Sequence, residues 1–204
     1  MTRTGQVAAL LCALLLVATA CGDEEPDATG GSSEFINEVT LTLMRRQDST
    51  FQHAVVVDPD GRGPLPWQVQ QGSLHLVPNA SYTATITLTN STVTPPVDVT
   101  PLINSLKLQH RFFYSVDPEG GVLATDLTID SNSAEYGEAF AIHVPAGVES
   151  RTWTLGVLLS HYEGDSKGNG LVPGALTDVE VSFQLETWRH CSATYCSFSL
   201  PGTK

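Results

Sequence analysis

Basic residues are scarce in this chain. Its 204 residues include 10 Lys and Arg against 22 Asp and Glu, and the formal net charge is -12. An acidic balance of this size argues against binding to nucleic acid, or to anionic lipid through a basic face. Motifs that are typical of particular reactions are scarce as well: there is no HExxH, no GxxxxGK and no GxGxxG after a predicted strand. We therefore expect a non-enzymatic protein, with a hydrolase that uses carboxylates as the least favoured alternative.

Long apolar runs are absent except for one, from Val7 to Cys21. This run is shorter than the ~20 residues that a membrane-spanning helix needs. Arg3 precedes it and small residues end it, which is typical of a secretory signal peptide over residues 1–20. The segment LVATAC resembles a bacterial lipobox, although Ala18 stands where a larger aliphatic residue is usual, and it predicts that Cys21 is lipidated. The alternative is an ordinary signal-peptidase site with an incidental Cys21.

The segment after Cys21 is polar and acidic. Residues 22–34 consist only of Gly, Ser, Asp, Glu, Pro, Thr and Ala, which cannot bury apolar surface, so residues 21–34 are expected to be a flexible tether. Several acyl chains at one cysteine give stable anchoring. The acidic residues also resemble the surface-export signal of some outer-membrane lipoproteins, with a merely solvated linker as the alternative. We expect the protein in the cell envelope, at the outer membrane or cell surface, with the membrane as a partner through its lipid.

Cysteine is rare, with four in the chain. Cys12 lies in the signal peptide and Cys21 is the lipidation candidate, which leaves Cys191 and Cys196. Exported chains meet an oxidising compartment, so these two predict a local disulfide in a C-terminal turn and tail, residues 191–204. Metal binding by two thiols alone is less favoured, because structural sites use four ligands.

Residues 35–190 alternate between apolar and polar side chains, the period of half-buried strands. In the clearest run, Tyr82 to Asn90, the even positions up to Leu88 are apolar and the odd positions are threonine. Thr100 and Pro101 are expected to open the single helix, through about Leu108, with Thr100 as its cap. The pattern predicts an all-β fold, an antiparallel, immunoglobulin-like β-sandwich of about nine strands, with a barrel second. The predicted strands are Val39–Leu43, Phe51–Asp58, Gly72–Val77, Tyr82–Asn90, Gln109–Val116, Leu123–Ile129, Ala139–Val144, Arg151–Tyr162 and Val179–Trp188.

Two histidines are the candidate metal ligands. His110 and His161 each share strand parity with large apolar residues, and each lies near the end of a predicted strand. Two imidazoles from neighbouring strands, with Asp165 or Asp178 adding an oxygen, would suit Cu or Zn. The alternative is two ordinary histidines, one in the core and one at a strand end. A divalent metal is accordingly the candidate cofactor.

Two further patterns suggest binding. Asp58 and Asp60 precede Gly61 with the spacing that opens a Ca²⁺ loop, and Asp165 begins a similar stretch, but neither has the later Glu, and plain turns explain both. Trp67, in a proline-containing loop, and Trp188, on the polar parity of its strand, are candidate exposed contacts for a protein or carbohydrate ligand. Most other aromatic residues share parity with aliphatic ones and are expected in the core.

From about Val39 to Glu186, the order of features resembles a group of bacterial membrane-anchored lipoproteins without an established activity. The segments that carry the resemblance are TLTL (residues 40–43), YTATITLTN (82–90), HRFFYS (110–115), LLSHYEG (158–164) and TDVEVSFQ (177–184). The resemblance implies a lipid-anchored β-sandwich and adds no catalytic residue. The leading hypothesis is a non-enzymatic envelope protein that binds a ligand or partner, and the alternative is an envelope metal-binding protein that uses His110 and His161.

Overall fold

A computed structural model describes residues 35–61, 65–120, 122–125, 127–164, 167 and 171–187. These residues form eleven strands and one short helix, α1 (Thr100–Ser105). The strands are β1 (Glu38–Arg45), β2 (Phe51–Val57), β3 (Gln68–Gln71), β4 (Leu74–Leu76), β5 (Ala80–Asn90), β6 (Val97–Asp98), β7 (His110–Asp117), β8 (Leu123–Thr125), β9 (Ala139–Val144), β10 (Arg151–His161) and β11 (Leu176–Thr187). No helix among the described residues is long and apolar enough to cross a membrane.

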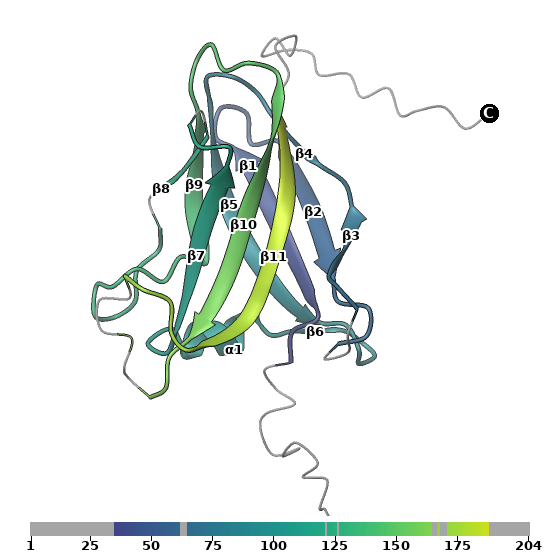
Figure 1. The fold of residues 1–204 in the computed structure, drawn as a ribbon, viewed down its shortest axis with the longest axis vertical. Helices are drawn as coiled ribbons and strands as arrows, with labels where there is room; N and C mark the ends of the chain where they lie inside the picture. The colour runs from purple at the N-terminus through teal and green to yellow at the C-terminus, as the bar shows by residue number, and fades with distance from the viewer. Residues whose placement is uncertain are drawn as a thin grey trace, which may run out of the picture. The chain divides into compact units, whose positions relative to one another are not determined.

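The strands form two sheets that pack face to face, as Figure 1 shows for β7, β10 and β11 in front of β1, β5 and β9. The larger sheet has the order β3-β2-β1-β5-β9-β8, with β6 paired to the end of β5, and the smaller has the order β4-β11-β10-β7. All strand pairs are antiparallel except β4 with β11. The prediction of an all-β, largely antiparallel sandwich is confirmed, and its immunoglobulin-like type stays a prediction.

The core lies between the sheets and follows from the alternation in the sequence. Along β5 every second side chain is buried, and Ile86 and Leu88 have no exposed surface. The facing strand β10 buries Trp153, Leu155 and Val157 in the same way. Because successive side chains of a strand point to opposite faces, each of these strands presents one apolar face to the other sheet. Burial of these faces is the main stabilising contribution to the fold.

Several elements differ from the sequence prediction. Strands β3 and β6 were not predicted, since all their side chains are exposed and leave no burial pattern. The expected strand Leu123–Ile129 is shorter, because β8 ends at Thr125 and Ile129 makes only an isolated bridge to Glu135. The last predicted strand, Val179–Trp188, corresponds to β11, which begins three residues earlier than predicted, at Leu176.

The helix begins where expected but is capped differently. Pro lies at its start, yet the capping position falls on Val99, and no side chain caps it. Thr100 is therefore not the cap. Its hydroxyl instead accepts a hydrogen bond from the Leu88 N–H at 2.8 Å, which binds the start of α1 to β5. The helix ends at Ser105 rather than near Leu108, because the chain leaves helical geometry at Leu106 and turns toward β7.

Some predicted features lie outside the described residues. They are the signal peptide and tether (1–34), Cys21, Asp165, Trp188, and the C-terminal segment with Cys191 and Cys196.

Candidate metal centre

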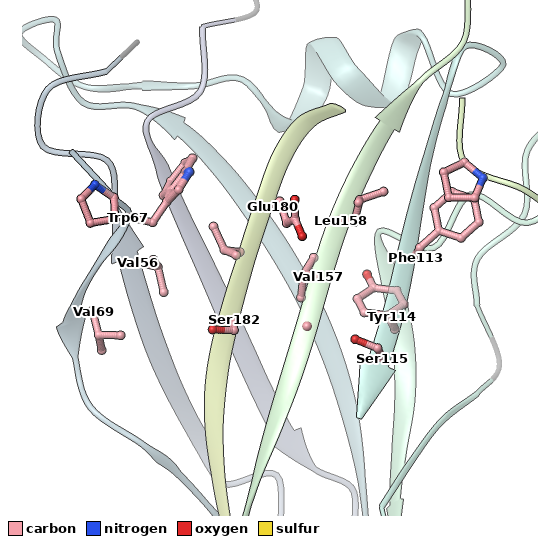
Figure 2. Close-up of a pocket in the computed structure, with 14 residues that line it drawn as sticks. Val56, Trp67, Val69, Phe113, Tyr114, Ser115, Val157, Leu158, Glu180 and Ser182 are labelled. Carbon is pink, nitrogen blue, oxygen red and sulfur yellow. The ribbon is translucent and has the colours of Figure 1, made fainter. Parts of the chain in front are cut away.

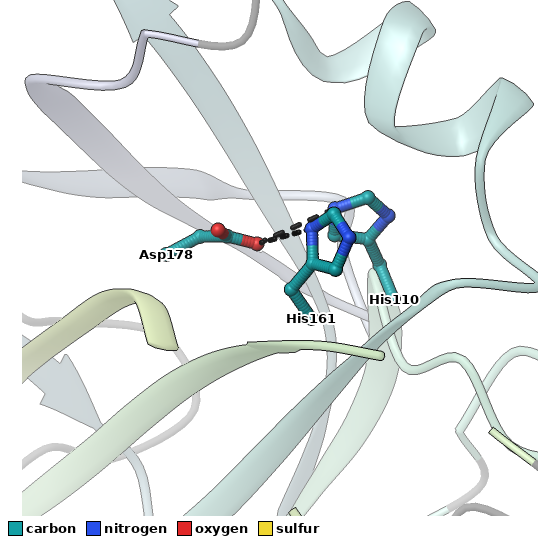
Figure 3. A group of neighbouring side chains, drawn as sticks. All are labelled: His110, His161 and Asp178. Atoms are coloured by element: carbon teal, nitrogen blue, oxygen red, sulfur yellow. Dashed lines mark ion pairs between the residues drawn. The ribbon is translucent and has the colours of Figure 1, made fainter. Parts of the chain in front are cut away.

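Three strand ends of the smaller sheet bring two histidines and one aspartate together. His110 is the first residue of β7, His161 is the last of β10, and the antiparallel register places them directly opposite one another. On its other side, β10 pairs with β11, and in this pairing Ser160 lies opposite Thr177. The next pair joins Leu159 to Val179, so Asp178 is the extra residue of a β-bulge. A bulge redirects a side chain, and here Asp178 turns toward the imidazoles (Figure 3).

The three side chains are close enough to share one ion. Asp178 Oδ2 lies 3.3 Å from His110 Nε2 and 3.7 Å from His161 Nδ1. One ligand atom from each residue lies within 4.8 Å of the other two. Ligands 2.0–2.1 Å from a tetrahedral Zn²⁺ are about 3.3 Å apart, so small side-chain movements would complete the geometry.

The orientation of His110 is set by a backbone carbonyl. Its Nδ1 lies 3.0 Å from the carbonyl oxygen of Leu106, which can only accept a hydrogen bond, so Nδ1 carries the proton. In the neutral ring, Nε2 then presents a lone pair toward Asp178 Oδ2. Two lone pairs that face each other repel, unless a proton or a metal cation lies between them. A carbonyl that holds the outer nitrogen of a histidine is also the usual support of a metal-bound imidazole.

The site is buried on one side and open on the other. The side chain of His110 is 1 % exposed, whereas those of His161 and Asp178 are 24 % and 30 % exposed. The two rings meet edge to face with centroids 4.5 Å apart, which restricts their movement. A cation can therefore enter from solvent past His161 and Asp178 and bind the pre-oriented His110. Two imidazoles and one carboxylate suit Zn²⁺ or Cu²⁺ and leave one coordination position for water or another ligand.

The remaining predicted site residues are distributed unevenly. Of the two aspartates considered as oxygen ligands, Asp178 lies at the histidines and Asp165 is outside the described residues. Asp58 Oδ1 accepts a hydrogen bond from the Asp60 N–H at 3.4 Å, and Asp60 Oδ2 accepts one from the Leu65 N–H at 3.1 Å. Both carboxylates thus bind backbone of their own turn, as the turn interpretation of this stretch predicts.

Trp67 is half-buried and packs against the core, so it is less exposed than the sequence predicts. It lines a hollow of about 660 Å³ whose lining residues come from both sheets, and Figure 2 shows Trp67 beside Val56 and Val69. Phe113 and Tyr114 of β7 lie at the opposite end of this hollow. Trp67 also lines a second, smaller pocket.

One buried ion pair carries no signature in the sequence. Lys167 donates to Asp130 Oδ2 at 2.8 Å and to the Lys107 carbonyl at 2.9 Å, and both charged side chains are almost fully buried. Burial raises the pKa of Asp130, but the hydrogen bonds from Lys167 and from the Asn132 and Ala134 N–H groups outweigh it, so the pKa of this carboxyl is lowered. Lys167 lies in a glycine-rich loop, and nothing in the local pattern indicates its partner.

The fold and the cluster thus define an all-β sandwich with a two-histidine, one-aspartate group at one end of its smaller sheet. Comparison of the chain with protein-family models and with curated protein sequences found no match.

Proposed function

We propose that this chain is a lipid-anchored protein of the bacterial cell envelope whose sandwich domain binds a divalent transition metal, Zn²⁺ or Cu²⁺. The observation that carries the metal is the convergence of His110, His161 and Asp178, with ligand atoms within 4.8 Å of one another. The contact between His110 Nδ1 and the Leu106 carbonyl supports it, because it orients the ring with Nε2 toward Asp178. Binding rather than catalysis is proposed, because the sequence contains neither HExxH nor GxxxxGK.

Metal titration tests the proposal. The processed chain, purified in neutral detergent without a polyhistidine tag, is titrated with Zn²⁺ and with Cu²⁺ by calorimetry. One ion per chain is expected. His161→Ala and Asp178→Asn should each weaken binding by about 100-fold or more, because even loss of an outer-shell partner costs about 10- to 100-fold.

His53→Ala is the matched control, since His53 is exposed on β2 and lies outside the cluster. It should bind like the wild type. An unchanged affinity in His161→Ala, or an equal loss in His53→Ala, would show that the metal binds elsewhere or without specificity. Acid should also release the metal, because only a neutral imidazole can coordinate.

The anchor rests on the sequence: a signal peptide, Cys21 in a lipobox-like segment, and a polar tether. Mass spectrometry of the N-terminal peptide from native membranes should show acyl chains on Cys21 as the first residue. A Cys21→Ser variant should leave the membrane fraction. An unmodified Cys21 in the native protein would exclude the anchor without affecting the metal proposal.

A further inference from the structure

A second pocket lies next to the metal cluster and shares Asp178 with it. Its volume is about 320 Å³. Its walls come from the segment before β1, the turn after β2, the loop before β3, and the start of β11. The size falls within the range of about 300–1,000 Å³ that is usual for small-molecule sites.

Two carboxylates face this pocket. Asp58 is only 8 % exposed, and within the described part of the chain no Lys, Arg or His forms an ion pair with it. Burial raises the pKa of Asp58, and a hydrogen bond with Asp60 adds to the effect. A buried carboxylate without a cation is costly, so an entering positive charge would be stabilised there. Asp178 supplies the second negative group, and no described residue that lines the pocket is basic.

Two aromatic residues also line the pocket. Trp67 lines the pocket, and Phe35 packs directly over Gly61. A Cβ at Gly61 would lie 2.7 Å from Phe35 Cζ, and Gly61 has φ of +70°, so glycine allows both the turn and the close approach of the ring. The faces of aromatic rings attract cations, and this attraction is strongest in sites sheltered from water.

We propose that this pocket binds a small organic ammonium ion, with its charge between Asp58 and Asp178 and its alkyl groups against Phe35 and Trp67. The combination of carboxylates and aromatic faces selects positive charge together with apolar surface, which a hydrated metal ion lacks. The proposal is independent of the metal except at Asp178. Because both ligands use that carboxylate, Zn²⁺ and the ammonium ion should weaken each other's binding by the same factor.

The test is a calorimetric titration with choline and with butylamine, in a detergent that contains no ammonium group. The neutral isostere of choline, 3,3-dimethylbutan-1-ol, has the same shape without the charge. We expect saturable binding of at least one ammonium compound at one site per chain, and at least tenfold weaker binding of the neutral compound. Failure of both ammonium compounds to bind, or equal binding of the isostere, would overturn the proposal.

Variants separate this site from the metal site. Asp58→Asn should lose ammonium binding and keep Zn²⁺, His161→Ala should do the reverse, and Asp178→Asn should lose both. Glu119→Gln is the control, because Glu119 is an exposed carboxylate that does not line the pocket. If Asp58→Asn unfolds, as a thermal melt would show, Trp67→Leu replaces it and should also weaken ammonium binding. Unchanged affinity in a folded Asp58→Asn would assign the binding to another place.

Discussion

Gly174 holds the loop that follows β10 against the end of that strand. Its N–H donates to Ser160 Oγ at 2.7 Å, and a Cβ at this position would lie 2.2 Å from the carbonyl oxygen of His161. The obstacle is backbone, so it cannot rotate away as a side chain could. The absence of a side chain at Gly174 therefore permits the close approach of this loop to the backbone of His161.

Gly174→Ala should lower the free energy of unfolding by about 1–3 kcal/mol, the usual cost of overpacking a close contact. It should also weaken Zn²⁺ binding, because the displaced carbonyl belongs to a ligand residue. Thermal unfolding and metal titration measure the two effects. Gly72→Ala is the control, since a Cβ at Gly72 would meet no atom within 4 Å. Equal behaviour of the two variants would show that the contact at Gly174 has no role.

At the scale of residues, the sequence indicates the two histidines but does not decide which aspartate, Asp165 or Asp178, lies beside them. Strand parity and position near strand ends single out His110 and His161, and antiparallel pairing then places them opposite each other. Asp178 follows from a register shift, and a bulge has no signal in the alternation of β11. The hydrogen bond from His110 to Leu106 depends on where α1 ends, which the sequence places several residues later.

At the scale of elements, Lys167 ties its loop to the segment between β8 and β9. The side chains of Lys167 and Asp130 are 3 % and 1 % exposed. Removal of one partner would leave the other charge buried and unpaired, which typically costs about 3–5 kcal/mol. Asp130→Asn should therefore destabilise the domain strongly at neutral pH, as measured by chemical unfolding. Glu119→Gln, in an exposed turn, is the control and should have little effect.

The same pair predicts acid sensitivity. The pKa of Asp130 is lower in the folded protein than its ordinary value of about 3.9. The stability from this carboxylate is therefore fully present above about pH 4 and is lost as the pH falls through its folded pKa. The wild type should lose more stability than Asp130→Asn between about pH 4 and 2. Parallel slopes of stability against pH would show that Asp130 does not contribute.

Strands with one buried face are the elements that sequence predicts best. β5 alternates over its whole length and β10 alternates from Trp153 to Leu159, because each packs one face on the core. β3 is exposed at all positions and gives no period, so only its partner β2 determines it. The loop with Lys167 is determined by a partner 37 residues away, and local composition carries no trace of such a contact.

For the sandwich as a whole, alternation predicts two layers but not the order of strands within them. Half-buried strands favour antiparallel pairing, and this is what most pairs show. The exception is the parallel pairing of β4 with β11. It involves three residues of each strand, and the two strands are about a hundred positions apart in the chain. Such pairings are decided by the packing of the assembled sheets, since no local feature of either strand specifies its neighbour.

The position of β11 has a consequence for how the domain is made. β11 is the last described strand, yet it lies in the interior of its sheet, between β4 and β10. Until it arrives, β10 has one open edge and β4 has no partner within its sheet. The aspartate of the metal cluster arrives with the same strand. The smaller sheet therefore cannot be completed before β11 is present, and a chain that emerges N-terminus first cannot bring all three proposed ligands together before nearly all of the described domain has emerged.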